Sequence, residues 1–129
     1  MLTNAGLGAK QEHLFIQTAD ENGRSLGGAS RIIPKQTDEA GKAEIVQIVT
    51  IDNMIGLDRK VSIIQLDVEG YEKEALTGGI KTIQRCLPII ILEFSLDNTL
   101  INSDWFLENI LSLGYRKVNE IDCNFVFSR

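Results

Sequence analysis

Three carboxylates lie close together in the sequence, where an apolar segment gives way to a helix-forming one. Asp67 and Glu69 follow the apolar run 61–66, Gly70 comes next, and Glu72 opens the helical stretch. A carboxylate in such a place can accept a proton or orient a hydroxyl group. In open α/β sheets, ligands bind beside the carboxyl ends of the strands, which is where Asp67 would lie.

A fourth carboxylate, Glu93, follows a second apolar run, 88–92. If the two runs form neighbouring strands, Asp67 and Glu93 lie close together. While the backbone stays extended, Asp67 and Glu69 point to the same side. Gly70 then permits a sharp turn into the helix. The sequence therefore predicts a crevice lined by two or three carboxylates.

A purely structural interpretation of these acids stays open beside the functional one. Acidic side chains in the first turn of a helix are stabilised by the helix dipole, typically by about 0.3–1 kcal/mol. This accounts for Glu72 and can account for Glu69. It accounts less well for Asp67, which directly follows a buried strand, and it does not apply to Glu93.

The surrounding pattern predicts an α/β fold with a mostly parallel sheet and a C-terminal antiparallel hairpin. The expected strands cover 12–17, 45–50, 61–67, 88–94, 115–120 and 123–128, and the expected helices cover 71–86 and about 104–113. Residues 19–44 read as a long loop with a short strand near 30–33. Gly78 and Gly79 indicate either close packing of the helix on the sheet or a break between two helical pieces.

Length and composition limit the classes of function. The chain has 129 residues, a net charge of −5 and no basic block, which fits one domain and argues against nucleic-acid and anionic-membrane surfaces. One histidine and two distant cysteines disfavour zinc and His-dependent nucleophilic sites, and both cysteines are expected to be buried. No signal-like or membrane-spanning segment is seen, so the expected location is cytoplasmic.

The order of these motifs resembles the C-terminal half of the FkbM-type methyltransferases. The matching residues are Thr50 and Asp52 in a T-x-D turn, Asp67, Glu69, Gly70 and Glu72 in a D-x-E-G-x-E run, Leu76 with Gly78 or Gly79, and Pro88 with Glu93. One departure is Gln65, where the family often has lysine. The D-x-E-G-x-E run is fairly specific in combination with the other elements and weak alone.

The resemblance implies a Rossmann-like class I methyltransferase fold that uses S-adenosylmethionine. It implies O-methylation of a sugar or small-metabolite hydroxyl, with Asp67, Glu69 and Glu93 as catalytic residues and Glu72 as a substrate-binding residue. A minority alternative is that the acids hold a divalent cation that binds the acceptor diol.

The family's acidic, glycine-rich cofactor loop has no match here, so the resemblance implies an N-terminally truncated domain. The remaining cofactor residues would be Asn4, Ala5 and Gly6, near the adenine. Strand 61–67 would then have an exposed edge, which implies a homo-oligomer or pairing with a missing N-terminal half. The alternative function is a non-catalytic remnant or interaction module. A different Rossmann-like nucleotide binder is disfavoured by the lack of a GxGxxG loop.

Overall fold

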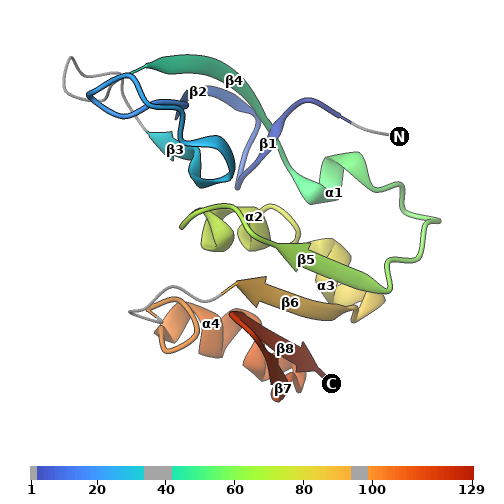
Figure 1. Ribbon diagram of the computed structural model, residues 1–129. Coiled ribbons are helices and arrows are strands. Elements are labelled where there is room, and N and C mark those ends of the chain that lie inside the picture. Colours follow the sequence, from blue (N-terminus) through green and yellow to red (C-terminus); the bar gives the residue numbers. More distant parts are fainter. Residues whose placement is uncertain (1–2, 34–41, 94–98) are drawn as a thin grey trace. The chain divides into compact units, whose positions relative to one another are not determined.

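The computed structural model describes residues 3–33, 42–93 and 99–129, which fall into two compact units (Figure 1). The first unit consists of Met1–Ile51 with Val68–Gly78, and the second consists of Asp52–Asp67 with Gly79–Arg129. The chain therefore passes from the second unit to the first within the acidic run itself, directly after Asp67. Each unit is described by itself below.

The first unit contains a four-stranded sheet in the order β1-β4-β2-β3. Its elements are β1 (Gly6–Leu7), β2 (Glu12–Gln17), the 3₁₀ helix η1 (Gly27–Ala29), β3 (Arg31–Ile33), β4 (Ala43–Val49) and α2 (Glu72–Thr77). β1 runs parallel to β4, while β2 runs antiparallel to both β3 and β4. The buried core of this unit includes Ile48, Ala75 and Leu76, each fully enclosed.

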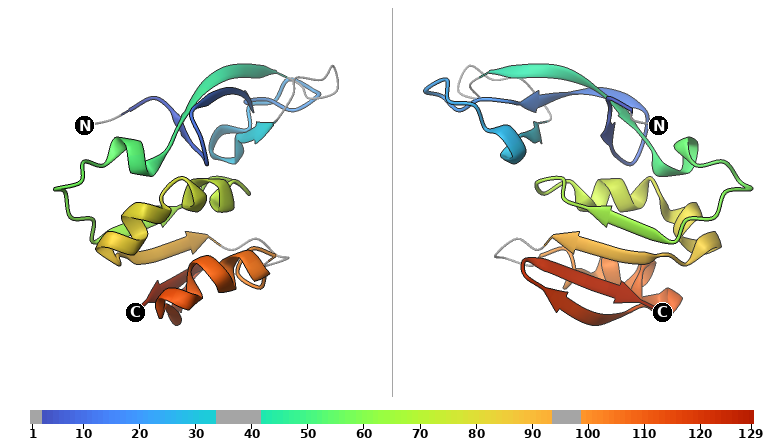
Figure 2. Two further views of the ribbon diagram at one scale, coloured as in Figure 1. Left: turned by 180° about the vertical axis from the view of Figure 1, so that it is seen from behind. Right: turned by 45° about the vertical axis from the view of Figure 1, so that its right-hand side comes forward.

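The second unit contains a four-stranded sheet in the order β5-β6-β8-β7. Its strands are β5 (Ile63–Leu66), β6 (Ile89–Glu93), β7 (Arg116–Ile121) and β8 (Asn124–Ser128), and its helices are α3 (Ile80–Cys86), α4 (Asp104–Asn109) and the 3₁₀ helix η2 (Leu111–Leu113). The short α1 (Ile51–Met54) lies where the chain enters this unit. Figure 2 shows α3 and α4 on the same face of the sheet.

The core of the second unit lies between that sheet and its helices. Phe106 of α4 and Phe127 of β8 meet edge to face with ring centroids 5.1 Å apart, a favourable aromatic geometry. The buried Tyr115 hydroxyl donates to the Pro88 carbonyl oxygen at 2.6 Å. The ring contact joins α4 to β8, and the Tyr115 hydrogen bond joins the segment before β7 to the start of β6.

The predicted α/β class is confirmed, but the prediction of a mostly parallel sheet is wrong. Among the described strands, only β1–β4 and β5–β6 pair in parallel, and both sheets are mixed. The difference arises because β2 pairs antiparallel with both β3 and β4, in a sheet that does not include β5 and β6. The strand near 30–33 and the C-terminal hairpin are confirmed. That the chain forms one domain stays a prediction.

The helix expected over 71–86 is broken at Gly78 and Gly79 into α2 and α3. The break between two helical pieces is therefore observed, and Gly78 also packs closely against another part of the backbone. A Cβ atom on Gly78 would collide with the Gly8 carbonyl oxygen and lie 3.2 Å from the Thr50 Cβ. Only a residue without a side chain fits there.

The helices in the described part of the chain are short. None of them combines the length and the apolar character that a membrane-spanning helix requires.

Candidate functional site

Asp67 and Glu93 lie at the carboxyl ends of two neighbouring parallel strands in the second unit. β5 and β6 pair with Leu66 opposite Leu92, so Asp67 follows the last residue of β5 and Glu93 ends β6. A carboxylate oxygen of Asp67 and one of Glu93 lie within 4.8 Å of each other. The expectation that these strands are neighbours and bring the two acids together is confirmed.

Strand periodicity sets the direction of the Glu93 side chain. Ile64 and Leu66 of β5 and Leu92 of β6 are buried, and Figure 2 shows α3 and α4 on one face of this sheet. Successive side chains along a strand alternate between faces. Glu93, the last residue of β6, therefore projects to the face opposite Leu92, and Asp67, which follows β5, is exposed.

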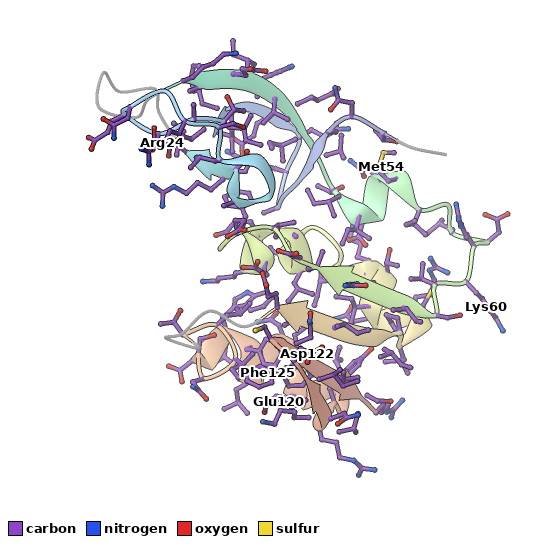
Figure 3. The ribbon with its side chains drawn as sticks, viewed as in Figure 1. Arg24, Met54, Lys60, Glu120, Asp122 and Phe125 are labelled. Atoms are coloured by element: carbon purple, nitrogen blue, oxygen red, sulfur yellow. The ribbon has the colours of Figure 1, made fainter. Side chains whose placement is uncertain are left out.

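Asn124 is a residue of this edge that the sequence did not reveal. It begins β8 and lies directly opposite Glu93 across the β6–β8 pair. A carboxamide offers both a donor and an acceptor beside the acid. Asn124 directly follows the hairpin turn between β7 and β8, in which Asp122 has φ 51. Figure 3 labels Asp122 in this turn.

The hairpin also corrects the expectation that both cysteines are buried. Cys123 is exposed because it lies in the turn between β7 and β8, and Cys86 is half-buried at the end of α3.

Glu69 and Gly70 form a tight turn in the first unit. Glu69 is exposed with φ 51, and Gly70 has φ 90. Glycine adopts this left-handed conformation without strain, whereas it costs another residue about 1–2 kcal/mol. Backbone strain at an exposed acidic side chain is a feature that clusters at functional sites.

Glu72 closes the same turn from the first position of α2. Its carboxylate oxygen Oε1 accepts hydrogen bonds from the backbone N–H groups of Val68, at 3.1 Å, and Gly70, at 3.3 Å. These bonds give Glu72 a structural role, in agreement with the helix-start interpretation. Its assignment as a substrate-binding residue stays a prediction.

Asp52, from the T-x-D motif, also has a structural role. Its two carboxylate oxygens accept from the backbone N–H of Lys81, at 3.2 Å, and of Thr82, at 2.8 Å. These groups lie in the first turn of α3, whose N-cap residue Gly79 has no side chain to cap them. Unpaired N–H groups at a helix start need such an acceptor, so Asp52 caps α3 from a distant part of the sequence.

Asn4, Ala5 and Gly6, expected near the cofactor's adenine, precede and enter β1 of the first unit. Asn4 is exposed, Ala5 is half-buried, and Gly6 pairs with Ile48 of β4. A Cβ atom on Gly6 would lie 2.8 Å from the Ile48 Cδ1, so a larger residue there would have to displace the end of the Ile48 side chain. The cofactor assignment of the three residues stays a prediction.

Tyr71 is a second residue that sequence reasoning missed. It follows the Glu69–Gly70 turn, and its ring lies 3.3 Å from where a Cβ atom on Gly8 would be. Burial raises the pKa of its hydroxyl, and the negative charges of Glu74 and Glu12 raise it further. The group therefore stays protonated and can donate a hydrogen bond through the neutral pH range.

A hollow of about 510 Å³ lies in the second unit, but not at the carboxyl ends of the strands. It is lined by Leu57, Asp58, Lys60, Val61, Ser62, Arg85, Cys86 and Leu87, which precede β5 and end α3. The Arg85 guanidinium donates to the carbonyl oxygens of Arg59, at 2.8 Å, and Gly56, at 3.4 Å. Arg85 therefore fixes the loop before β5, and the hollow is separate from the Asp67–Glu93 edge.

Comparison with solved structures shows the same fold in one methyltransferase. The crystal structure of Methyltransferase FkbM from Methylobacillus flagellatus KT matches with a TM-score of 0.55 and 17% sequence identity, over 98% of this chain. The match covers 27% of that protein, so the chain spans about a quarter of its length. No curated protein matches the chain.

The model of the Methyltransferase FkbM domain family matches residues 2–117. That span contains the whole acidic run, Glu93 and the strands that hold them. The chain therefore belongs to the FkbM methyltransferase domain family.

Proposed function

We propose that this chain forms the acceptor side of an S-adenosylmethionine-dependent methyltransferase that methylates a hydroxyl group of a sugar or small metabolite. One observation carries the proposal: in a chain of a methyltransferase family, two carboxylates meet at the carboxyl ends of neighbouring parallel strands. Such an edge is where α/β sheets bind their ligands.

Asp67 is the residue best placed to act on the acceptor hydroxyl. As the acceptor oxygen attacks, its proton passes to a carboxylate, and Asp67 is exposed for this at the end of β5. Glu93 and Asn124, opposite each other on β6 and β8, can orient the acceptor. The strained, exposed Glu69 two residues after Asp67 is the third candidate acid.

When bound, the cofactor would supply an electrophilic methyl group on a sulfonium sulfur. The methyl carbon would go to the acceptor oxygen, and the sulfur would keep the bonding electrons as a neutral thioether. The residues proposed to hold it fit in part. The exposed Asn4 carboxamide offers a donor and an acceptor that suit the edge of a purine. Gly6 already pairs with Ile48 in the sheet, so Asn4 and Ala5 are the better contacts.

The first test is calorimetric titration of the purified chain with S-adenosylhomocysteine. Micromolar binding is expected, and Asn4→Ala should weaken it, whereas Asp67→Asn should leave it unchanged. In a methyl-transfer assay over a panel of sugars, Asp67→Asn should lower kcat/KM by about 10²-fold or more. The matched control is Glu21→Gln, an exposed acid in a loop of the first unit. A folded chain that binds no S-adenosylhomocysteine contradicts the proposal.

A second candidate function is a non-catalytic interaction module. It is favoured by the position of β5, which lies at an edge of its sheet and pairs within the described chain with β6 alone. This function predicts stable assembly without cofactor affinity, so the same titration separates the two candidates.

A further inference from the structure

Gly8, in the loop between β1 and β2, is held by several parts of the first unit (Figure 1). Its N–H donates to the Val49 carbonyl oxygen of β4 at 3.0 Å, next to the pairing of β1 with β4. A Cβ atom on Gly8 would lie 2.6 Å from the Ile48 Cγ2 and 3.3 Å from the Tyr71 Cε1. The Gly8 carbonyl group also lies close to Gly78, where a Cβ atom would collide with it. The backbone of this loop is therefore closely packed.

Two of these contacts come from the two ends of α2. Tyr71 is the N-cap residue of α2, and Gly78 is its C-cap residue. A close-packed interior transmits displacements, because it contains few voids that could absorb them. A shift of Gly8 would therefore act on both ends of this helix.

The N-terminal end of α2 also fixes the acidic turn. The Tyr71 N–H donates to the Val68 carbonyl oxygen at 3.2 Å, and Glu72 Oε1 accepts from the N–H groups of Val68 and Gly70. Glu69 lies between these bonds with its strained φ of 51. A strained residue keeps its conformation only while the surrounding contacts determine it. The position of the Glu69 side chain therefore depends on how α2 begins.

Tyr71 takes part in both sets of contacts, since its ring packs on Gly8 and its backbone closes the Glu69 turn. Gly8 follows closely after Asn4 and Ala5, the proposed cofactor contacts. We propose that Tyr71 is a positioning residue that couples cofactor binding at Asn4 and Ala5 to the position of Glu69. The inference rests on the proposed function for the cofactor contacts, whereas the packing that carries it lies within the first unit.

The coupling acts through the Tyr71 ring. A bound cofactor restrains the segment before β1, and through Gly8 and the ring it restrains the acidic turn as well. Coupling free energies between two sites are reciprocal, so an acceptor that fixes Glu69 raises the cofactor affinity by the same factor. The ring carbon Cε1 makes the contact with Gly8. A phenylalanine therefore keeps the coupling, and a shorter aliphatic side chain loses it.

Residue-resolved amide hydrogen exchange of the full chain, with and without S-adenosylhomocysteine, tests the coupling. In the wild-type chain the ligand should slow exchange of the Gly70 N–H, which is bonded to Glu72, by about fivefold or more. Tyr71→Leu should abolish this slowing and weaken S-adenosylhomocysteine binding by about fivefold or more. Tyr71→Phe should keep both the slowing and the affinity, which a role of the hydroxyl group would not allow. Tyr71→Met replaces Tyr71→Leu if that chain does not fold.

Phe15→Leu is the matched control, because Phe15 is another half-buried aromatic residue of the first unit, on β2. A loss of packing alone lowers stability in both leucine variants, but only Tyr71→Leu should change the ligand affinity and the slowing at Gly70. A wild-type chain that binds the ligand without slowing at Gly70 overturns the coupling. Equal results for Tyr71→Leu and Phe15→Leu, or a loss of the slowing in Tyr71→Phe, overturn it as well. A wild-type chain that binds no ligand contradicts the proposed function, and this inference with it.

Discussion

In each unit, a carboxylate accepts hydrogen bonds from backbone N–H groups at or just before the start of a helix. The two carboxylates differ in how far they lie from those N–H groups in the sequence. In the first unit, Glu72 lies in α2 itself and binds the N–H groups of Val68 and Gly70 just before it. In the second unit, Asp52 reaches Lys81 and Thr82 of α3 across about thirty residues of chain. The Glu72 hydrogen bonds can therefore form together with α2 itself, whereas the Asp52 hydrogen bonds require the second unit to be folded.

The C-terminal end of α2 does not follow this difference between the units. There the first unit also depends on a contact between residues far apart in the sequence. Gly78 closes α2, and a Cβ atom on it would collide with the backbone carbonyl group of Gly8. Backbone cannot yield to a new side chain as a flexible side chain can. We therefore expect a substitution at Gly78 to lower stability more than one at either helix start.

Gly78→Ala should lower the free energy of unfolding by about 3 kcal/mol or more, since overpacking against backbone forces the end of α2 away from the segment that follows β1. Urea denaturation measures the loss. Gly28→Ala is the control, because a Cβ atom there meets nothing within 4 Å, and it should change stability by less than about 0.5 kcal/mol. Equal stability of the two variants would show that the Gly78–Gly8 approach is not needed.

Asp52→Ala should have the next largest effect and sharpens the contrast between the helix starts. It leaves two N–H groups at the start of α3 without their charged acceptor, which should cost about 2 kcal/mol. Hydrogen exchange should accelerate at Lys81 and Thr82 beyond the global change. Asp52→Asn, which keeps one acceptor oxygen, should lose less, and Glu108→Ala, an exposed acid in α4, should lose little. If Asp52→Ala and Glu108→Ala unfold alike, Asp52 does not cap α3.

Tyr115 gives the second unit a pH dependence. Burial raises the pKa of its hydroxyl from 10.0 to about 12, and the charge of Arg129 opposes this shift. Above pH 10 the unfolded chain releases this proton before the folded chain does, so the folded state binds more protons and stability falls as pH rises from 10 to 12. The same hydroxyl also donates to Pro88, and Tyr115→Phe should cost about 1 kcal/mol near neutral pH.

Urea denaturation at a series of pH values from 9 to 11 provides the measurement for Tyr115. The wild-type chain should lose stability over the upper part of this range, and the Tyr115→Phe chain should lose less. Parallel curves for the two chains would show that another group causes the alkaline loss.

The same distinction between near and distant contacts explains what the sequence predicted. The strand at 12–17 and the hairpin turn near Asp122 follow from local alternation and turn residues, and they are confirmed. The strand expected at 61–67 is confirmed over 63–66. The structural alternative for Glu72 also rested on local reasoning, because a first-turn acid acts on its own helix start. The proximity of Asp67 and Glu93 needed one assumption, that two apolar strands are neighbours.

What the sequence did not predict depends on pairing between distant segments. No local pattern links Asp52 to α3, Asn124 to Glu93 or Gly8 to Gly78, since each contact joins residues far apart in the chain. The antiparallel pairing of β2 with β3 and β4 was missed for the same reason. Strand order and direction are set by tertiary packing, which strand propensity does not encode.

The smallest changes in stability are expected for Glu72, which accepts structural hydrogen bonds, and for Asp67, which lies at a strand end. Glu72→Gln weakens two hydrogen bonds at the turn before α2 and should cost about 0.5–1 kcal/mol, since bonds to a charged group are stronger than neutral ones. Asp67→Asn should leave stability unchanged or raise it by up to about 0.5 kcal/mol, because it removes a charge close to Glu93. Urea denaturation of both variants at low salt measures the opposite signs.

The sign of the Asp67 effect matters more than its size. An acid kept for structure should cost stability when it is neutralised, as Glu72 should, whereas an acid kept for function commonly opposes stability. High salt should abolish the gain in Asp67→Asn, since it screens exposed charges. A clear loss of stability in Asp67→Asn would place Asp67 with Asp52 and Glu72 among the structural acids, and the proposed acceptor site would then lose its central residue.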